Sequence, residues 1–306
     1  MRRLRFATLT GALAALVVAC TAAQLDIPPL TPDEGGAHLP GKVVWHDLLT
    51  DTPQQTRDFY GELFGWEFRP LPGGVNYELI YFRGEPIGGM VDQTRLPTQA
   101  DISQWVVVLG VADVDAAVDQ VRTGGGTVFT EPTSLGARGR IAVVADPQGA
   151  LLALLQTDGR DPVDRQAPPA SGVFLWNELW TGDPASAASF YMALAPYSQD
   201  VRELQAGEQT MDYHVLESSG KPRVGIRGKP MQELPSRWVS YLRVGDETAL
   251  KQIVSRVEEL GGGVLASATP RPAGGSVAVI AGPSGAGIAL QTWPVQSVQA
   301  NEEGSQ

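Results

Sequence analysis

One segment of this chain occurs twice, and the repeat limits the folds that the chain can adopt. Trp45 to Trp66 reads WHDLLTDTPQQTRDFYGELFGW, and Trp176 to Tyr197 reads WNELWTGDPASAASFYMALAPY. Each copy opens with Trp-x-Asp/Glu-Leu, continues through a Pro that suits the first turn of a helix, and carries Phe-Tyr in that helix. The same offset of 131 residues relates the two Phe-Tyr pairs, so we infer an internal duplication.

The residues around the first copy predict one strand, one helix and three further strands. Apolar runs and turn residues place these elements at Val43 to Leu49, Thr52 to Phe64, Trp66 to Arg69, Tyr77 to Phe82 and Ile87 to Val91. A second unit of the same kind follows, with a strand at Trp105 to Val111, a helix at Asp113 to Thr123 and strands near Val128, Ile141 to Val144 and Leu151 to Leu155. Two βαβββ units therefore form a first domain.

The landmarks of the first domain return in the second half of the chain. Trp105 corresponds to Trp238, the glycines at 124–126 to those at 261–263, and the turn at 146–149 to the turn at 282–285. Residues 157–172 have the composition of a linker. We therefore predict domains at 42–156 and 173–293, followed by a polar, acidic and disordered tail at 294–306.

The N-terminus has the pattern of a bacterial export signal. Three arginines within the first five residues precede an uncharged run at 6–19, which is shorter than the ~20 residues that a membrane span needs. Small residues then lead to Cys20, the only cysteine, in a pattern that resembles a lipobox. We predict that residues 1–19 are removed, that Cys20 carries lipid, and that residues 20–41 form a tether. Plain cleavage and a retained signal anchor are the alternatives.

These features predict a protein of the bacterial cell envelope that contacts the membrane through its lipid anchor only. In a bacterium with two membranes, Thr21 after Cys20 resembles sorting to the periplasmic face of the outer membrane. The formal net charge is −11, and loss of the signal with its arginines makes the chain more acidic. Such a charge argues against nucleic acid as a partner and repels anionic lipid headgroups.

The repeated pattern resembles the vicinal oxygen chelate superfamily of glyoxalases, bleomycin-resistance proteins and dioxygenases. The resemblance implies an α+β fold of two tandem domains, in each of which a pair of βαβββ units forms a curled, mixed sheet. The sheet encloses a cup, and the helices lie outside it. Because single-domain relatives usually pair, we expect the two domains to pack as an intramolecular pseudo-dimer.

In metal-dependent members of that superfamily, His, Glu or Gln side chains from the strands bind one divalent cation in each cup. Counting from the helix starts and from the turns at 146–149 and 282–285 maps three such positions in each domain. The residues there are Trp45, Val106 and Ala153 in the first domain and Trp176, Val239 and Ala289 in the second. Indole and alkyl groups do not ligate metals, so we predict a protein without metal or other cofactor.

His46 and His214 are the histidines that a displaced site would draw on. His46 follows Trp45 directly, so strand alternation places it on the opposite face, where we expect a structural histidine. His214 follows Tyr213 on a middle strand whose faces the sequence does not assign, and it has no evident partner.

Asp47 and Glu178 are the polar residues that the duplication places on the cup faces, two positions after Trp45 and Trp176. Each carboxylate is interpreted either as a ligand acceptor or general base, with a pKa raised by an apolar cup, or as a structural acid that Arg or backbone N–H groups satisfy. The remaining candidates for the cup lining are aromatic residues that are also typical of a core: Tyr77, Trp105, Tyr213 and Trp238.

The favoured function is binding of a small organic molecule without metal. One alternative is a glyoxalase-like or dioxygenase-like enzyme with unusual ligands drawn from Asp47, Glu178, His46 or His214. The other is an envelope scaffold whose cups are plugged by Trp45 and Trp176.

Overall fold

The computed structural model describes residues 26–31, 37–97, 100–158, 160–165, 167–206, 209–271 and 274–293. The predicted signal at 1–19, Cys20 and the tail at 294–306 lie outside these residues. Within the described ranges no helix is long and apolar enough to cross a membrane.

The first half of the chain forms an eight-stranded sheet with the strand order β2-β3-β4-β1-β5-β8-β7-β6. Its strands are β1 (Val43–Thr50), β2 (Glu67–Pro70), β3 (Glu78–Phe82), β4 (Glu85–Asp92), β5 (Gln104–Gly110), β6 (Thr127–Ser134), β7 (Arg140–Ala145) and β8 (Leu151–Gln156). Its helices are α1 (Pro53–Phe64) and α2 (Val114–Thr123), with short 3₁₀ turns η1 (Pro72–Gly74), η2 (Gln93–Arg95) and η3 (Gly136–Arg138).

The second half repeats this order as β10-β11-β12-β9-β13-β16-β15-β14. The strands are β9 (Phe174–Thr181), β10 (Ser198–Ala206), β11 (Gln209–Ser218), β12 (Lys221–Gly228), β13 (Arg237–Val244), β14 (Gly263–Pro270), β15 (Ser276–Ala281) and β16 (Gly287–Thr292). The helices are α3 (Pro184–Leu194) and α4 (Glu247–Arg256). The predicted α+β class and the four βαβββ units are confirmed.

Local sequence explains where the helices begin and end. Asp113, Asp183 and Asp246 cap α2, α3 and α4, since each carboxylate accepts a hydrogen bond from a backbone N–H of the first turn. Helix α1 lacks a side-chain cap but starts at Pro53, whose missing N–H needs no partner there. It ends at Gly65, whose φ of 73° is left-handed and suits glycine.

Side chains of the central strands alternate between two faces of each sheet. We call the face that carries Trp45, Asp47 and Leu49 the cup of domain 1, and the face that carries Trp176, Glu178 and Trp180 the cup of domain 2. On the opposite face, residues such as Leu48 and Leu179 pack in the apolar clusters that contain the helices. The helices therefore lie outside the cups, as the family resemblance implied.

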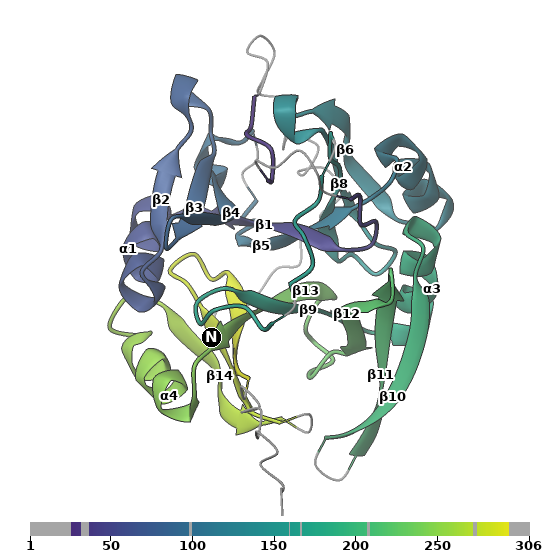
Figure 1. Cartoon of the computed structure of the whole chain (residues 1–306). Helices are drawn as coiled ribbons and strands as arrows, with labels where there is room; N and C mark the ends of the chain where they lie inside the picture. The colour runs from purple at the N-terminus through teal and green to yellow at the C-terminus, as the bar shows by residue number, and fades with distance from the viewer. Residues whose placement is uncertain are drawn as a thin grey trace, which may run out of the picture.

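The two domains pack against each other about a pseudo-two-fold axis. Figure 1 shows the sheets one above the other, with α1 beside α4 and α2 beside α3. His46 and Asn177 occupy equivalent positions in the repeat, yet Nε2 of His46 lies 2.9 Å from Oδ1 of Asn177. A contact between equivalent residues is what such an axis requires, so the predicted pairing of the domains within one chain is present.

Similar contacts, made by the equivalent Phe59 and Phe190 on glycines at non-equivalent positions, extend this interface on both sides of the axis. A Cβ on Gly124 would lie 2.8 Å from the ring of Phe190, and a Cβ on Gly262 would lie 2.5 Å from the ring of Phe59. Glycine therefore lets the aromatic ring of each domain approach the backbone of the other. Each of the two largest apolar clusters consequently contains residues of both domains.

The segment between the domains is bonded to both of them. Asp164 accepts hydrogen bonds from Lys42 of domain 1 at 3.1 Å and from Nη2 of Arg223 of domain 2 at 3.0 Å. Arg223 lowers the pKa of Asp164 to about 2, with Lys42 contributing. Trp66 also donates its indole N–H to the carbonyl oxygen of Gly172 at 3.0 Å. The predicted linker thus forms part of the domain interface.

Candidate functional site

Glu178 lies at the centre of the cup of domain 2 and is completely buried. Its Oε1 accepts hydrogen bonds from Tyr213 at 2.9 Å and from Nη2 of Arg271 at 2.7 Å. Its Oε2 accepts from the indole of Trp180 at 3.1 Å and from the hydroxyl of Tyr241. Both carboxylate oxygens are therefore saturated with donors, one of which carries a full positive charge.

This arrangement sets the protonation states in the cup. Burial raises the pKa of Glu178, but the charge of Arg271 and the hydrogen bonds from Tyr241, Arg271 and Trp180 outweigh it, so the pKa lies below its usual range. Burial and the charge of Glu178 raise the pKa of Tyr213 and of Tyr241. At neutral pH the group is an ionised glutamate held by an arginine and neutral phenols.

A glycine on the neighbouring strand makes room for this network. Gly225 of β12 is in register with Glu178 of β9, and a Cβ there would lie 2.0 Å from the hydroxyl oxygen of Tyr213. Domain 1 has an equivalent glycine: Gly89 is in register with Asp47, and a Cβ there would lie 2.0 Å from the hydroxyl oxygen of Tyr77. Glycine at these positions lets each tyrosine reach its carboxylate.

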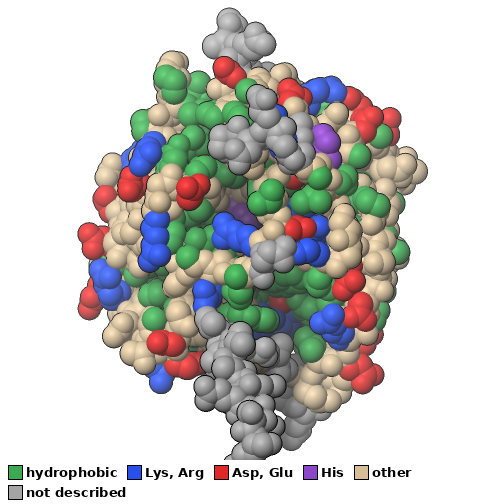
Figure 2. Space-filling view, viewed as in Figure 1, with side chains coloured by type: hydrophobic (Ala, Val, Ile, Leu, Met, Phe, Trp, Pro, Cys, Tyr) green, Lys and Arg blue, Asp and Glu red, His purple; other side chains and the backbone are tan. Residues whose placement is uncertain are grey.

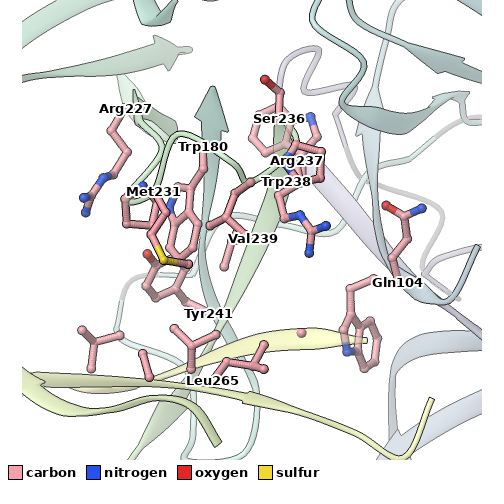
Figure 3. Close-up of a pocket in the computed structure, with 18 of the residues that line it drawn as sticks. Gln104, Trp180, Arg227, Met231, Ser236, Arg237, Trp238, Val239, Tyr241 and Leu265 are labelled. Carbon is pink, nitrogen blue, oxygen red and sulfur yellow. The ribbon is translucent and has the colours of Figure 1, made fainter. Parts of the chain in front are cut away.

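The cup of domain 2 opens into a cavity of about 980 Å³. Figure 3 shows Trp180, Tyr241, Arg227 and Met231 on one side of it, Gln104 on the opposite side, and Leu265 below. Gln104 and Trp105 extend the lining into domain 1. Met231 and Leu265 are 57% and 60% exposed, which makes them two of the most exposed large apolar side chains in the described part of the chain.

The cup of domain 1 holds a related but different network. Asp47 Oδ1 accepts hydrogen bonds from the hydroxyl of Tyr77 at 2.6 Å and from the indole of Trp45 at 3.1 Å. Arg138 donates to the hydroxyl of Tyr77 at 3.1 Å and lies 4.6 Å from the ring centre of Trp45. Burial raises the pKa of Asp47, against the hydrogen bond from Tyr77 and the charge of Arg138.

A segment of the chain itself packs into this first cup. Ile27 and Leu30, which precede the domain, are buried in the same cluster as Trp45. Nε of Arg138 donates to the carbonyl oxygen of Pro28 at 2.8 Å, and the N–H of Ile27 donates to Leu135 at 2.9 Å. Residues 26–31 of the predicted tether are therefore a docked segment and not a free spacer, because they carry apolar side chains that fit the cup.

The structure gathers six of the predicted lining residues at the two cups. Trp176 donates its indole N–H to Tyr213 at 2.8 Å, so Trp176, Glu178 and Tyr213 meet in domain 2 as Trp45, Asp47 and Tyr77 do in domain 1. Trp105 and Trp238 point the other way, into the core, where their indoles donate to Tyr60 and Tyr191 at 3.1 Å. Both are nevertheless among the residues that line the cavity.

The histidines face away from the cups. His46 is buried, stacks on Phe174 with a centroid distance of 3.7 Å, and has its pKa lowered to about 4 by burial. His214 is bonded to Gln199 on the face that carries Leu216. Asp47 and Glu178 lie in separate cups. The alternative metal site that would use His46, His214, Asp47 and Glu178 is therefore not formed. Strand alternation places the histidines on the opposite faces of the sheets, and the duplication places the two carboxylates in different domains.

The donors present in the cups do not fit a divalent cation. The six mapped positions face the cups, but they carry indole, isopropyl and methyl groups. Glu178 is already neutralised by Arg271, at 2.7 Å. Among the described residues, no group of three His, Cys, Asp or Glu side chains lies close enough to hold a metal ion.

Sequence reasoning missed the two arginines and two of the aromatic donors. Arg271 and Arg138 both come from the loop before the third strand of a unit. The backbone N–H of Arg271 donates to the carbonyl oxygen of Gly275, and in domain 1 the backbone N–H of Leu135 makes the same bond to Gly139. Arg271 therefore corresponds to Leu135, and Arg138 lies at a different position of the loop. Because the two arginines are not at equivalent positions, comparison of the two halves of the sequence does not identify them. Trp180 did carry a signal, since it follows Glu178 by the strand period of two.

Comparisons with known proteins agree with this fold. The profile of the Glyoxalase/Bleomycin resistance protein/Dioxygenase superfamily matches residues 42–154. "Putative glyoxylase CFP32" of Mycobacterium tuberculosis is 31% identical over 249 residues, which cover 80% of this chain and 92% of that protein. "Anthracycline biosynthesis protein DnrV" of Streptomyces peucetius is 28% identical over 274 residues, covering 82% and 93%.

Solved structures show the same fold at lower identity. A Mn(II)-bound glyoxalase from Novosphingobium aromaticivorans superposes with a TM-score of 0.55 at 13% identity, over 83% of this chain and 82% of that one. A catechol 2,3-dioxygenase superposes with a TM-score of 0.56 at 13% identity, over 85% and 96%. The chain therefore belongs to the glyoxalase, bleomycin-resistance protein and dioxygenase superfamily, as a tandem pair of its domains.

Proposed function

We propose that this protein binds a small organic molecule, without metal, in the cup of domain 2. The observation that carries the proposal is the difference between the cups. Ile27 and Leu30 of the chain are buried in one, whereas the other forms a cavity of about 980 Å³. That volume lies in the range of small-molecule sites, and its mostly apolar lining with a few fixed polar groups is typical of them.

The chemistry of the cup supports binding over acid–base catalysis by Glu178. A general base at neutral pH works best with a pKa near 7, whereas that of Glu178 lies below its usual range. Its oxygens accept hydrogen bonds from four side chains, so no lone pair faces an open approach. Glu178 therefore orients Tyr241 and Arg271, which line the cavity, and also accepts a hydrogen bond from Tyr213.

A fluorescence titration tests the proposal. N-phenyl-1-naphthylamine is an uncharged aromatic probe that brightens in apolar sites, and we expect it to bind chelator-treated protein saturably. Ala266 lines the cavity, is exposed and lies on β14, so Ala266→Trp should block the probe without disturbing the core. Ser267→Trp is the matched control, because Ser267 is the next, exposed residue and does not line the cavity.

Equal binding of the probe by the wild type and Ala266→Trp would contradict the proposed site. A separate experiment tests the proposal that the protein binds its ligand without metal. After incubation with zinc, manganese or iron(II) and desalting, elemental analysis should find far less than one ion per domain. If close to one metal ion per domain is found, and if Glu178→Ala removes it, the proposal of binding without metal is wrong.

We also propose that the protein is a lipoprotein of the bacterial envelope, anchored through Cys20. The support is the sequence alone: the export pattern ends at the only cysteine. Only five residues lie between Cys20 and the docked Asp26, so over six steps of ~3.3 Å per extended residue the anchor would hold domain 1 within about 20 Å of the lipid. A Cys20→Ala protein that still fractionates wholly with carbonate-washed membranes would contradict the anchor.

A further inference from the structure

We infer that the ligand of this cavity is a small planar molecule that carries an anionic group. The inference rests on the proposed binding function and adds the chemical class of the ligand. It follows from a row of three side chains across the middle of the sheet, Arg227, Trp180 and Arg237.

Strand register builds this row. Trp180 of β9 pairs with Arg227 of the parallel strand β12 and with Arg237 of the antiparallel strand β13. Residues in register on neighbouring strands project to the same face, and all three line the cavity. The guanidinium carbon of Arg227 lies 5.9 Å from the ring centre of Trp180. In Figure 3 the two arginines flank Trp180 on opposite sides.

Within the described residues, no acidic side chain forms an ion pair with Arg227 or Arg237. In that same part of the chain, Arg227 donates a hydrogen bond to the carbonyl oxygen of Gly228, and Arg237 has neither a hydrogen bond nor an ion pair. Arg271 is already paired with Glu178. Asp101, the one acidic residue among the described residues of the lining, accepts hydrogen bonds from Gln93 and from the N–H of Ser103.

The rest of the chain makes this positive lining unexpected. The formal net charge is −11, so an average surface of this protein is acidic. Figure 2 shows acidic side chains spread over the displayed face, with basic side chains between them. Two guanidinium groups beside an indole, without an ion pair among the described residues, favour a flat ligand with a carboxylate, sulfonate or phosphate, because arginine binds such groups and stacks on aromatic faces.

The cup of domain 1 supplies an internal comparison. In the equivalent row, Leu49 pairs with Val91 and Gln104, so the cation–indole–cation row is absent there. Its occupant presents apolar side chains to the cup and an oxygen, that of Pro28, to Arg138. The two cups share their carboxylate–tyrosine network and differ in this row. Because domain 1 folds without these arginines, we assign Arg227 and Arg237 to ligand binding in domain 2 and not to stability of the fold.

Two probes with the same aromatic body test the inference. 8-Anilinonaphthalene-1-sulfonate carries a sulfonate that N-phenyl-1-naphthylamine lacks. We expect Arg227→Ala/Arg237→Ala to weaken binding of the sulfonate probe about tenfold or more, equivalent to about 1.4 kcal/mol, and to change binding of the neutral probe less than twofold. Raising NaCl from 50 to 500 mM should weaken only the sulfonate probe.

Matched variants separate charge from structure. Arg227→Lys/Arg237→Lys should retain most of the sulfonate binding. Arg202→Ala, which removes an exposed arginine of the same domain that pairs with Asp200 outside the cavity, should leave it unchanged. Displacement of the sulfonate probe by 1-naphthoate or 1-naphthyl phosphate, but not by 1-naphthalenemethanol, would identify the favoured anion.

The outcomes distinguish this inference from the proposed function. If the double alanine variant weakens both probes equally, or if 1-naphthalenemethanol competes as well as the anions, the anionic class is wrong while small-molecule binding stands. If neither probe binds the wild type, both proposals fail.

Discussion

At the scale of single residues, the ion pair between Glu178 and Arg271 dominates the cup of domain 2. Glu178 is fully buried and the side chain of Arg271 is 12% exposed, so each would be costly without the other. The depressed pKa of Glu178 means that the pair stabilises the fold above the ordinary carboxyl pKa of 4.5. That contribution is lost as the pH falls through the lower pKa of the folded state.

Replacing Arg271 by methionine should therefore destabilise the protein by roughly 3–5 kcal/mol at pH 7. Without Arg271, burial raises the pKa of Glu178, so the stability difference from the wild type should shrink as the pH falls toward 4. Urea unfolding at pH 7 and pH 4 measures both effects. Arg202→Met, at an exposed ion pair, should cost less than about 1 kcal/mol; a similar loss in both variants would contradict the role of the buried pair.

His46 predicts a second pH effect with its own window. Burial lowers its pKa from 6.5 to about 4, so the unfolded chain binds a proton between these values that the folded chain does not. Stability should fall by about 2 kcal/mol from pH 7 to pH 5 through this group. His46→Gln should remove that part of the slope in urea unfolding, and an unchanged slope would show that His46 is protonated when folded.

At the scale of elements, the strands show which parts of the site the sequence predicted. Period-two alternation placed Trp45 with Asp47 and Trp176 with Glu178 on the cup faces, and the structure has them there. It also separated His46 from Trp45. Trp105 and Trp238 were ambiguous, because an aromatic residue on a strand suits either face; both indoles bond to tyrosines of the helices α1 and α3.

Loops and termini account for what the sequence did not predict. Arg271 reaches Glu178 from a loop, and Arg138 reaches the hydroxyl of Tyr77 beside Asp47 from a loop, where side-chain direction follows no period. The docking of residues 26–31 depends on a cup that exists only in the folded domain, so composition alone suggested a free tether. The raised pKa considered for Glu178 is wrong for the same reason: the arginine that lowers it comes from a loop.

Gly225 of β12 gives a test of the tyrosine–carboxylate network. Gly225→Ala places a Cβ where the hydroxyl of Tyr213 lies, so we expect a loss of about 1–3 kcal/mol in the free energy of unfolding. Gly228→Ala on the same strand is the control, because nothing lies within 4 Å of its Cβ position. Equal unfolding midpoints for the two variants would show that Tyr213 moves aside without cost.

At the scale of the whole molecule, the domains share their cores and should unfold together. Phe190 of α3 is 8% exposed and packs against Gly124 of domain 1, in a cluster that contains residues of both halves. Phe190→Ala should cost about 3–5 kcal/mol. Hydrogen exchange measured by mass spectrometry should then speed up in protected peptides of both domains. An increase confined to domain 2 would mean that the domains unfold independently.

The central claim is that the two cups of one fold have different occupants: the chain's own segment in domain 1 and a small molecule in domain 2. A crystal structure of the protein with 8-anilinonaphthalene-1-sulfonate tests it most directly. We predict density for the probe beside Trp180 and Tyr241, with Ile27 and Leu30 still buried against Trp45. Probe density in the cup of domain 1 with residues 26–31 displaced, or an empty cup in domain 2, would contradict the account.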